Sequence, residues 1–217
     1  MRLAIALAAL SLALAATACQ APTLTPPPEQ ALYEQYCAVC HGVDGRTVKD
    51  MPSTPNLNSQ GMLTVVDDAF MTASIALGRP GENGRGKPGT KMAVYGEDYG
   101  GPLTNERITD LVAYIRRWQT EPSVALEPFE AKGDPVAGKR QFEVCVPCHG
   151  QDGWSAAGPS LAGETLQEGA SDAFLRHTIL NGRPGTTMPA FKMSDREVED
   201  LVTFVRTLYP PAGGESR

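Results

Sequence analysis

The sequence is poor in cysteine, histidine and aromatic residues. Its 217 residues include five Cys, three His, two Trp, six Tyr and six Phe. This length allows one large domain or two small ones. Two small domains with so few aromatic side chains would each have a thin core, so we expect something other than side chains to help complete each interior.

Positive charge is also scarce. The chain has 19 Lys and Arg against 25 Asp and Glu, a formal net charge of −6, and these charges are spread along the chain. A nucleic-acid-binding protein needs a continuous cationic face. The sequence therefore argues against a nucleic-acid partner.

An apolar run lies at the N-terminus, where Arg2 precedes residues 3–18. The small residues of the tripeptide 16–18 (Ala-Thr-Ala) stand where an exporting peptidase cleaves. We interpret residues 1–18 as a signal peptide. An uncleaved anchor ranks second, because so short a stretch barely spans the hydrocarbon layer of a membrane.

Cleavage after Ala18 would make Cys19 the first residue, and residues 15–19 resemble the lipobox of bacterial lipoproteins. The other four cysteines form two pairs, so Cys19 is the odd one. We predict a lipid on Cys19 and a proline-rich tether over residues 19–28, with ordinary cleavage and a disordered tail as alternatives. The expected location is the periplasmic side of a bacterial membrane, or the soluble periplasm if no lipid is attached.

The chain repeats itself. Residues 37–42 (Cys-Ala-Val-Cys-His-Gly) recur 108 residues later as Cys-Val-Pro-Cys-His-Gly, and a Pro-Gly-Thr-x-Met segment follows each copy. Each unit then ends in an amphipathic helical pattern, over which Arg116 and Arg206 also correspond. We predict a duplication organised as domain 29–120, linker 121–133, domain 134–210 and tail 211–217.

Helix-start signals support this division. Thr104 and Ser194 are expected to cap the closing helices, with Ser194 and Glu197 forming a capping box. Asp134 and Pro135 are suitable residues for the start of the helix that leads into the second cysteine pair.

A Cys-x-x-Cys-His motif can close a redox disulfide, supply half of a zinc site, or attach a haem. A thioredoxin-like motif does not need the adjacent His, and a zinc site would need further ligands that neither unit supplies. The motif in both copies, together with the export signal, favours two haem c groups. The predicted thioether and iron-binding residues are Cys37, Cys40 and His41 in the first unit and Cys145, Cys148 and His149 in the second.

The second axial ligand must differ from histidine in at least one unit, because only His177 remains. We predict Met92 and Met188, which lie in Gly/Pro-rich segments ahead of the closing helices. Methionine is more often core filler, and Met51, Met62, Met71 and Met193 compete for the role. We interpret His177, in a helix expected over 171–180, as a surface or propionate-side histidine.

These motifs resemble the class I cytochromes c, specifically two-domain dihaem members, over residues 29–210. The resemblance implies an all-α fold of two tandem domains, each a small helical fold wrapped around a covalently bound haem. It also implies that a proline carbonyl holds each proximal imidazole, and Pro55 and Pro159 match those positions.

The sequence departs from the family pattern in three places. Glu29 stands where the first helix usually has a glycine, and Phe142 is three residues before Cys145 rather than four. Ala93, not proline, follows Met92.

An iron with a histidine on one axial side and a methionine on the other has no open position. The expected function is therefore electron transfer and not catalysis. We predict a carrier between periplasmic or membrane-bound redox proteins. The alternatives are an electron-accepting subunit of a dehydrogenase or terminal oxidase, and a dihaem enzyme such as a peroxidase or sulfur-compound oxidase.

Four cations surround the Met92 segment: Arg79, Arg85, Lys87 and Lys91. We hypothesise that they steer an acidic redox partner toward the first haem. The alternative is a soluble loop whose charges are offset by Glu82, Glu97 and Asp98.

Overall fold

The computed structural model describes residues 27–50, 54–79, 92–154 and 157–209. The predicted signal peptide, Cys19 and the tail 211–217 therefore lie outside the described residues. Helices form every element within the described ranges, which also contain two isolated β-bridges, so the predicted all-α class is confirmed. None of the helices described there is long and apolar enough to cross a membrane.

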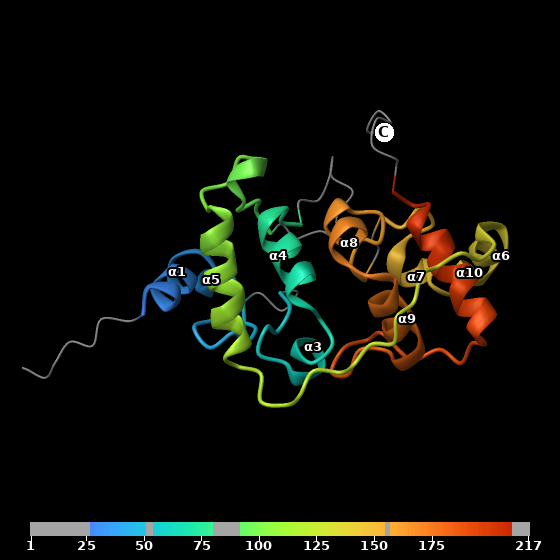
Figure 1. Ribbon diagram of the computed structural model, residues 1–217, viewed down its shortest axis with the longest axis horizontal. Helices are drawn as coiled ribbons and strands as arrows, with labels where there is room; N and C mark the ends of the chain where they lie inside the picture. The colour runs from blue at the N-terminus through green and yellow to red at the C-terminus, as the bar shows by residue number, and fades with distance from the viewer. Residues whose placement is uncertain (1–26, 51–53, 80–91, 155–156, 210–217) are drawn as a thin grey trace, which may run out of the picture.

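The helices fall into two groups, which we call the first and second domains (Figure 1). The first domain comprises α1 (Pro28–Tyr36), α2 (Ala38–His41), α3 (Gln60–Leu63), α4 (Asp68–Ala76), the 3-10 helix η2 (Glu97–Tyr99) and α5 (Asn105–Arg116). The second comprises α6 (Pro135–Gln141), the 3-10 helix η3 (Phe142–Val144), α7 (Val146–His149), α8 (Glu164–Gly169), α9 (Asp172–Asn181) and α10 (Asp195–Arg206).

The predicted caps are present. The Thr104 side chain accepts a hydrogen bond from the Arg107 backbone N–H, and Ser194 and Glu197 form the complete capping box at the start of α10. Asp134 accepts from the Val136 N–H ahead of Pro135, the first residue of α6. These bonds use backbone donors that a helix leaves unpaired in its first turn.

In the second domain, α6 crosses α10 at a glycine. A Cβ on Gly138 would lie 2.0 Å from the backbone oxygen of Asp200, so a larger residue cannot fit without moving a helix. Phe142 and Phe204 pack beside this crossing with ring centroids 5.2 Å apart. Phe142 reaches the core despite its unusual distance from Cys145, since the chain continues into the short helix η3.

The first domain makes the equivalent crossing without a glycine. Glu29 pairs with Arg117, which lies on the chain just after α5. Tyr33 is fully buried, with its ring 5.3 Å from that of Tyr114 and 5.2 Å from that of Trp118, and its hydroxyl donates to the Gly42 carbonyl at 2.8 Å. An aromatic cluster thus fills the space at this crossing.

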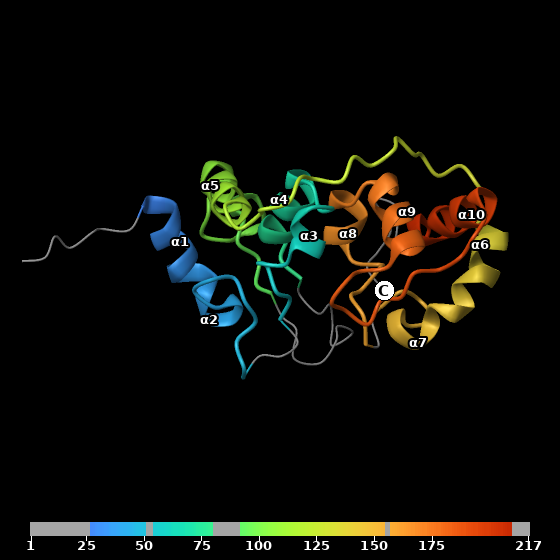
Figure 2. The same ribbon diagram turned by 90° about the horizontal axis from the view of Figure 1, so that it is seen from below.

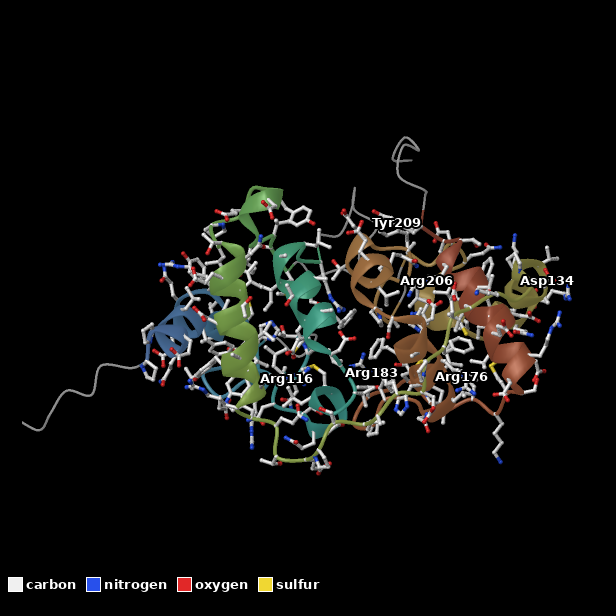
Figure 3. All side chains as sticks on the ribbon, in the orientation of Figure 1. Arg116, Asp134, Arg176, Arg183, Arg206 and Tyr209 are labelled. Carbon is white, nitrogen blue, oxygen red and sulfur yellow. The ribbon has the colours of Figure 1, made fainter. Side chains whose placement is uncertain are left out.

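An arginine near the end of each closing helix ties that helix to the middle of its domain. Arg206 donates through Nε to Asp172 at 2.7 Å, and its two terminal nitrogens donate to the carbonyls of Gln167 and Ala170. Arg116 repeats this pattern with Asp68, Leu63 and Val66. Figure 3 labels both arginines, and we call each set an arginine clamp.

The two domains pack against each other through α4 and α8, which lie side by side in Figures 1 and 2. The rings of Phe70 and Phe174 stack there with centroids 5.3 Å apart and planes 30° apart. The Thr165 hydroxyl donates to the Gly78 carbonyl at 2.5 Å, across the same interface. A polar bond and an aromatic stack therefore both join the domains.

The segment between α5 and α6 is bonded to both domains as it passes along the outside of the molecule (Figure 2). The Val124 N–H donates to the Thr64 carbonyl at 2.7 Å, and the Ala131 N–H donates to Asp172 at 2.8 Å. Its end is held by Asp200, which accepts from the Asp134 N–H. These contacts restrict how the two domains can move relative to each other.

We predict that Arg206→Gln lowers the free energy of unfolding by about 3 kcal/mol, because it removes three hydrogen bonds of a charged group and leaves partly buried acceptors unpaired. Chemical denaturation followed by circular dichroism measures the change. The exposed Arg140 on α6 provides the control, since Arg140→Gln should change the free energy by less than about 0.5 kcal/mol. Equal effects of the two substitutions would contradict the clamp.

Candidate functional site

Each Cys-x-x-Cys-His motif folds into a single helical turn. The His41 and His149 N–H groups donate to the carbonyls of Cys37 and Cys145, both at 2.9 Å. Gly42 and Gly150 end the turns with positive φ angles of 76° and 78°. Residues three and four apart share a helix face, so each turn carries two thiols and one imidazole on the same side.

The four thiols of these turns are free in the structure. Burial raises the pKa of Cys37 to about 12, and burial also raises the pKa of Cys145. Redox-active cysteines have lowered pKa values, so Cys37 and Cys145 differ from them in this respect. The described ranges contain no group of three or more His, Cys, Asp or Glu placed to hold a metal ion.

The two histidines are buried and held by a backbone carbonyl. His41 is 7% exposed and its Nδ1 lies 3.2 Å from the Pro55 oxygen; His149 is 6% exposed with its Nδ1 2.9 Å from the Pro159 oxygen. A carbonyl can only accept, so Nδ1 carries the proton and Nε2 keeps its lone pair for a metal. The contacts expected from the family resemblance are thus present in both domains.

Burial also determines the charge of these imidazoles. It lowers the pKa of both His41 and His149, and the positive charge of Arg79 contributes further at His41. A lowered pKa means that the ring remains neutral at neutral pH, which is the form that binds a metal.

The Met92 and Met188 segments are bonded to the residues that follow α4 and α9. The Arg79 N–H donates to the Met92 carbonyl at 2.8 Å, and the Arg183 N–H donates to the Met188 carbonyl at 3.1 Å. A glycine precedes each arginine, with φ of 64° at Gly78 and 67° at Gly182. A Cβ at either glycine would lie within 2.8 Å of the methionine oxygen, so glycine permits this close approach.

The other candidates for the second iron ligand do not lie in the two segments that bond to Arg79 and Arg183. Met71 is a buried part of α4, and Met62 and Met193 pack against the core from partly buried positions. His177 lies on α9, where its ring contacts the Asn181 side chain and lines a groove between α3 and α9. Met51 lies outside the described residues.

Two phenylalanines have a role that the sequence pattern did not indicate, and Arg79, predicted only as a docking cation, lies beside one of them. Phe70 and Phe174 stack between the domains, and the guanidiniums of Arg79 and Arg183 lie 5.5 Å and 5.8 Å from their respective ring centres. The tripeptide Asp-Ala-Phe, which occurs at 68–70 and again at 172–174, is the signal that could have identified the pair. Arg85, Lys87 and Lys91 lie outside the described residues.

Comparison with known proteins identifies both domains. Residues 30–119 match the family described as cytochrome c, and residues 134–205 match the family described as cytochrome c oxidase, cbb3-type, subunit III. The chain is similar to the cbb3-type cytochrome c oxidase subunit CcoP of Azospirillum sp. (strain B510), with 30% identity over 192 residues. It is also 28% identical over 187 residues to the subunit FixP of Bradyrhizobium diazoefficiens.

The matched regions cover 82% of this chain, which spans about 60% of the length of these relatives. A chain of the Kuenenia stuttgartiensis reducing HAO-like protein complex Kustc0457/Kustc0458 shares the fold, with a TM-score of 0.51 at 21% identity. That likeness covers 84% of this chain and 96% of the other.

Two cytochrome c domains imply two covalently bound haem c groups, and the predicted cofactor is confirmed. The chemistry of each turn fits this group. Two unpaired thiols lie next to a buried, neutral imidazole whose Nδ1–H is already bonded. This arrangement suits a macrocycle attached through sulfur and an iron bound through Nε2.

We predict that Gly182→Ala destabilises the protein more than Gly185→Ala. Both residues have a positive φ, so both substitutions should cost about 1–3 kcal/mol of backbone strain. Only at Gly182 would the new Cβ also collide with the Met188 segment, which adds about 1–3 kcal/mol; no atom lies within 4 Å of a Cβ at Gly185. Equal losses in chemical denaturation would show that the close approach is unimportant.

Proposed function

Because the chain belongs to the class I cytochromes c as a member with two haem domains, we propose that it transfers single electrons between redox proteins and does not itself turn over a substrate. The observation that carries this proposal is the repetition of one site in both domains. Each site has a buried imidazole held by a proline carbonyl, beside a cysteine pair and ahead of a methionine segment bonded to a Gly-Arg pair.

We assign the residues of the two sites as follows. The cysteines that attach the haems are Cys37, Cys40, Cys145 and Cys148. His41 and His149 would bind the two irons through Nε2, while the carbonyls of Pro55 and Pro159 orient their rings. The haem supplies an iron that accepts and releases one electron.

We assign Met92 and Met188 as the second residue that would hold each iron. Their thioethers would favour the reduced form of the iron. Gly78 and Gly182 allow the methionine segments to approach, and the backbone N–H groups of the following arginines hold them. Ala93 stands in place of a proline and leaves the Arg79 N–H bonded to the Met92 carbonyl. The backbone oxygen of Ala93 itself also approaches Gly78, where a Cβ would lie 2.4 Å from it.

Contacts around the two sites restrict movement of the helices and of the two domains. The arginine clamps, the bonded linker and the contact between α4 and α8 resist changes in shape. A carrier benefits from such resistance, because the environment then changes little when the iron gains an electron. A dihaem enzyme would instead need an axial ligand that a substrate can displace.

The relatives suggest the partner. CcoP and FixP are named as subunits of cbb3-type cytochrome c oxidases, so we assign this chain to electron delivery to a terminal oxidase, either as a bound subunit or as a separate carrier. The periplasmic face of a bacterial membrane is the location we assign. The apolar segment 3–18 supports export, and a lipid on Cys19 would hold the protein at the membrane through a short proline-rich tether.

The cationic segment after α4, with Arg79, Arg85, Lys87 and Lys91, is the docking surface we assign for an acidic partner. Arg79 lies over Phe70 at the domain interface. A test of docking therefore uses Arg85 and Lys87.

We predict that the double variant Cys145→Ala/Cys148→Ala carries one haem per chain where the parent carries two, measured by intact mass and by haem quantitation. Met188→Ala should leave both haems attached but open one iron to added imidazole, seen as a change in the absorption spectrum. Met193→Ala is the control and should exclude imidazole as the parent does. Two attached haems in the cysteine variant would contradict the assignment of these residues.

We predict that the reduced protein is reoxidised by membranes that contain a cbb3-type oxidase and that Arg85→Glu/Lys87→Glu slows this reaction at least several-fold at low salt. Added salt screens the attraction and should reduce the difference between variant and parent. The exposed pair Lys139 and Arg140, reversed in the same way, is the control. Unchanged rates in the Arg85→Glu/Lys87→Glu variant would contradict docking at these residues, and peroxide turnover by the isolated protein would contradict the carrier function.

A further inference from the structure

The turn that holds the Met92 segment receives a hydrogen bond from the other domain. Thr165, on α8 of the second domain, donates through its hydroxyl to the Gly78 carbonyl at 2.5 Å. A Cβ on Gly78 would lie 2.4 Å from the Ala93 oxygen and 2.7 Å from the Met92 oxygen, so the two segments are in close contact. The N–H of Arg79, the next residue, donates to the Met92 carbonyl. One side-chain hydroxyl thus connects the second domain to the methionine segment of the first.

This hydrogen bond lies in a buried part of the interface. Thr165 is 7% exposed, and Gly78 is buried. The phenylalanine stack holds α8 beside α4, and so does Gly169, where a Cβ would lie 2.6 Å from the Ala73 Cβ (Figure 1). Water competes little for a bond in such a place, and loss of the hydroxyl would remove a donor from a buried carbonyl.

The equivalent position of the first domain has no hydroxyl. Thr165 lies six residues after Pro159, and Gly61 lies six residues after Pro55. A Cβ on Gly61 would lie 3.3 Å from the Pro184 oxygen, so this residue also contacts the segment that follows α9 in the other domain. A glycine has no side chain with which to donate. At these paired positions, the side-chain bond therefore runs only from the second domain to the first.

The methionine segment that receives this bond is also the one without a proline. Ala93 follows Met92, whereas Pro189 follows Met188. A proline fixes its own φ angle and so reduces the number of conformations open to the chain around it. The Met92 segment lacks this restriction, and a contact from outside its own domain can replace it.

We propose that Thr165 is a positioning residue for the first iron site, and that its hydroxyl keeps the Met92 segment in place from the second domain. This inference rests on the proposed function, since it requires Met92 to hold the first iron. It makes the first site depend on the second domain, while the second site has no such dependence on Gly61. Loss of the hydroxyl should let the Met92 segment move away more often and expose the first iron to added ligands.

The test is an imidazole titration of the oxidised holoprotein carrying Thr165→Val, which removes the hydroxyl at nearly constant volume. Paramagnetic proton NMR distinguishes the two haems, which are assigned by comparison with Met188→Ala. The affinity of the first haem for imidazole should rise about three- to tenfold, the amount that corresponds to one buried hydrogen bond. The affinity of the second haem should change by less than about twofold.

Three further variants separate the hydroxyl from the packing of the side chain. Thr165→Ser keeps the hydroxyl and should bind imidazole as the parent does, whereas Thr165→Ala should behave as Thr165→Val does. The matched control is Thr64→Val. Thr64 is 9% exposed and donates to the Gln60 carbonyl within the first domain, so its substitution should change neither haem.

Hydrogen exchange provides a second measurement on the same proteins. The Arg79 amide should exchange faster in Thr165→Val than in the parent, because its acceptor, the Met92 carbonyl, moves away more often. The Arg183 amide, which donates to the Met188 carbonyl, should keep its parent rate.

An equal rise in imidazole affinity at both haems would overturn the proposal, because it would indicate general loosening of the protein. So would an unchanged first haem in Thr165→Val, or a Thr165→Ser variant as altered as Thr165→Val. The parent protein separates these results from a failure of the proposed function. Free binding of imidazole by both parent irons would contradict the methionine assignment, whereas a closed parent with an unaltered Thr165→Val variant would contradict only the role of Thr165.

Discussion

The hydrogen bond from the histidine Nδ1–H to a proline carbonyl is the interaction on which both sites depend. It places the proton on one ring nitrogen, orients the imidazole and leaves the other nitrogen for iron. The helical turn of the cysteine motif supplies the other half of the arrangement, since it ends at this histidine. The remaining structure holds these two short segments together while few large side chains are available to fill the space between them.

The duplicated domains show which contacts the fold requires and which it can replace. The arginine clamp appears in both domains with the same set of bonds, so it is the common means of attaching the closing helix. The crossing of the first and last helices differs. One domain uses the close approach at Gly138, and the other uses the aromatic cluster around Tyr33 and the ion pair between Glu29 and Arg117. Different packing thus supports the same site.

Contact between the domains links the two sites physically. Each methionine segment is bonded to an arginine, each arginine lies over a phenylalanine, and the phenylalanines stack. The linker is bonded to both domains and limits other arrangements. These contacts hold the two domains together more firmly than a free tether between two domains would.

The local features of this protein could be read from its sequence alone. The cysteine motifs, the helix caps, the amphipathic closing helices and the prolines opposite the histidines depend on short segments whose residue types and spacing decide the outcome. The contact between α4 and α8 could not be read in this way, because Phe70 and Phe174 look like ordinary core residues until two surfaces meet. Likewise, the sequence indicates only that Arg79 is one of several cations in a basic segment. The tertiary structure brings its charge close to that of Arg183. The sequence alone could not show this, because electrostatic interaction depends on distance in space and not on separation along the chain.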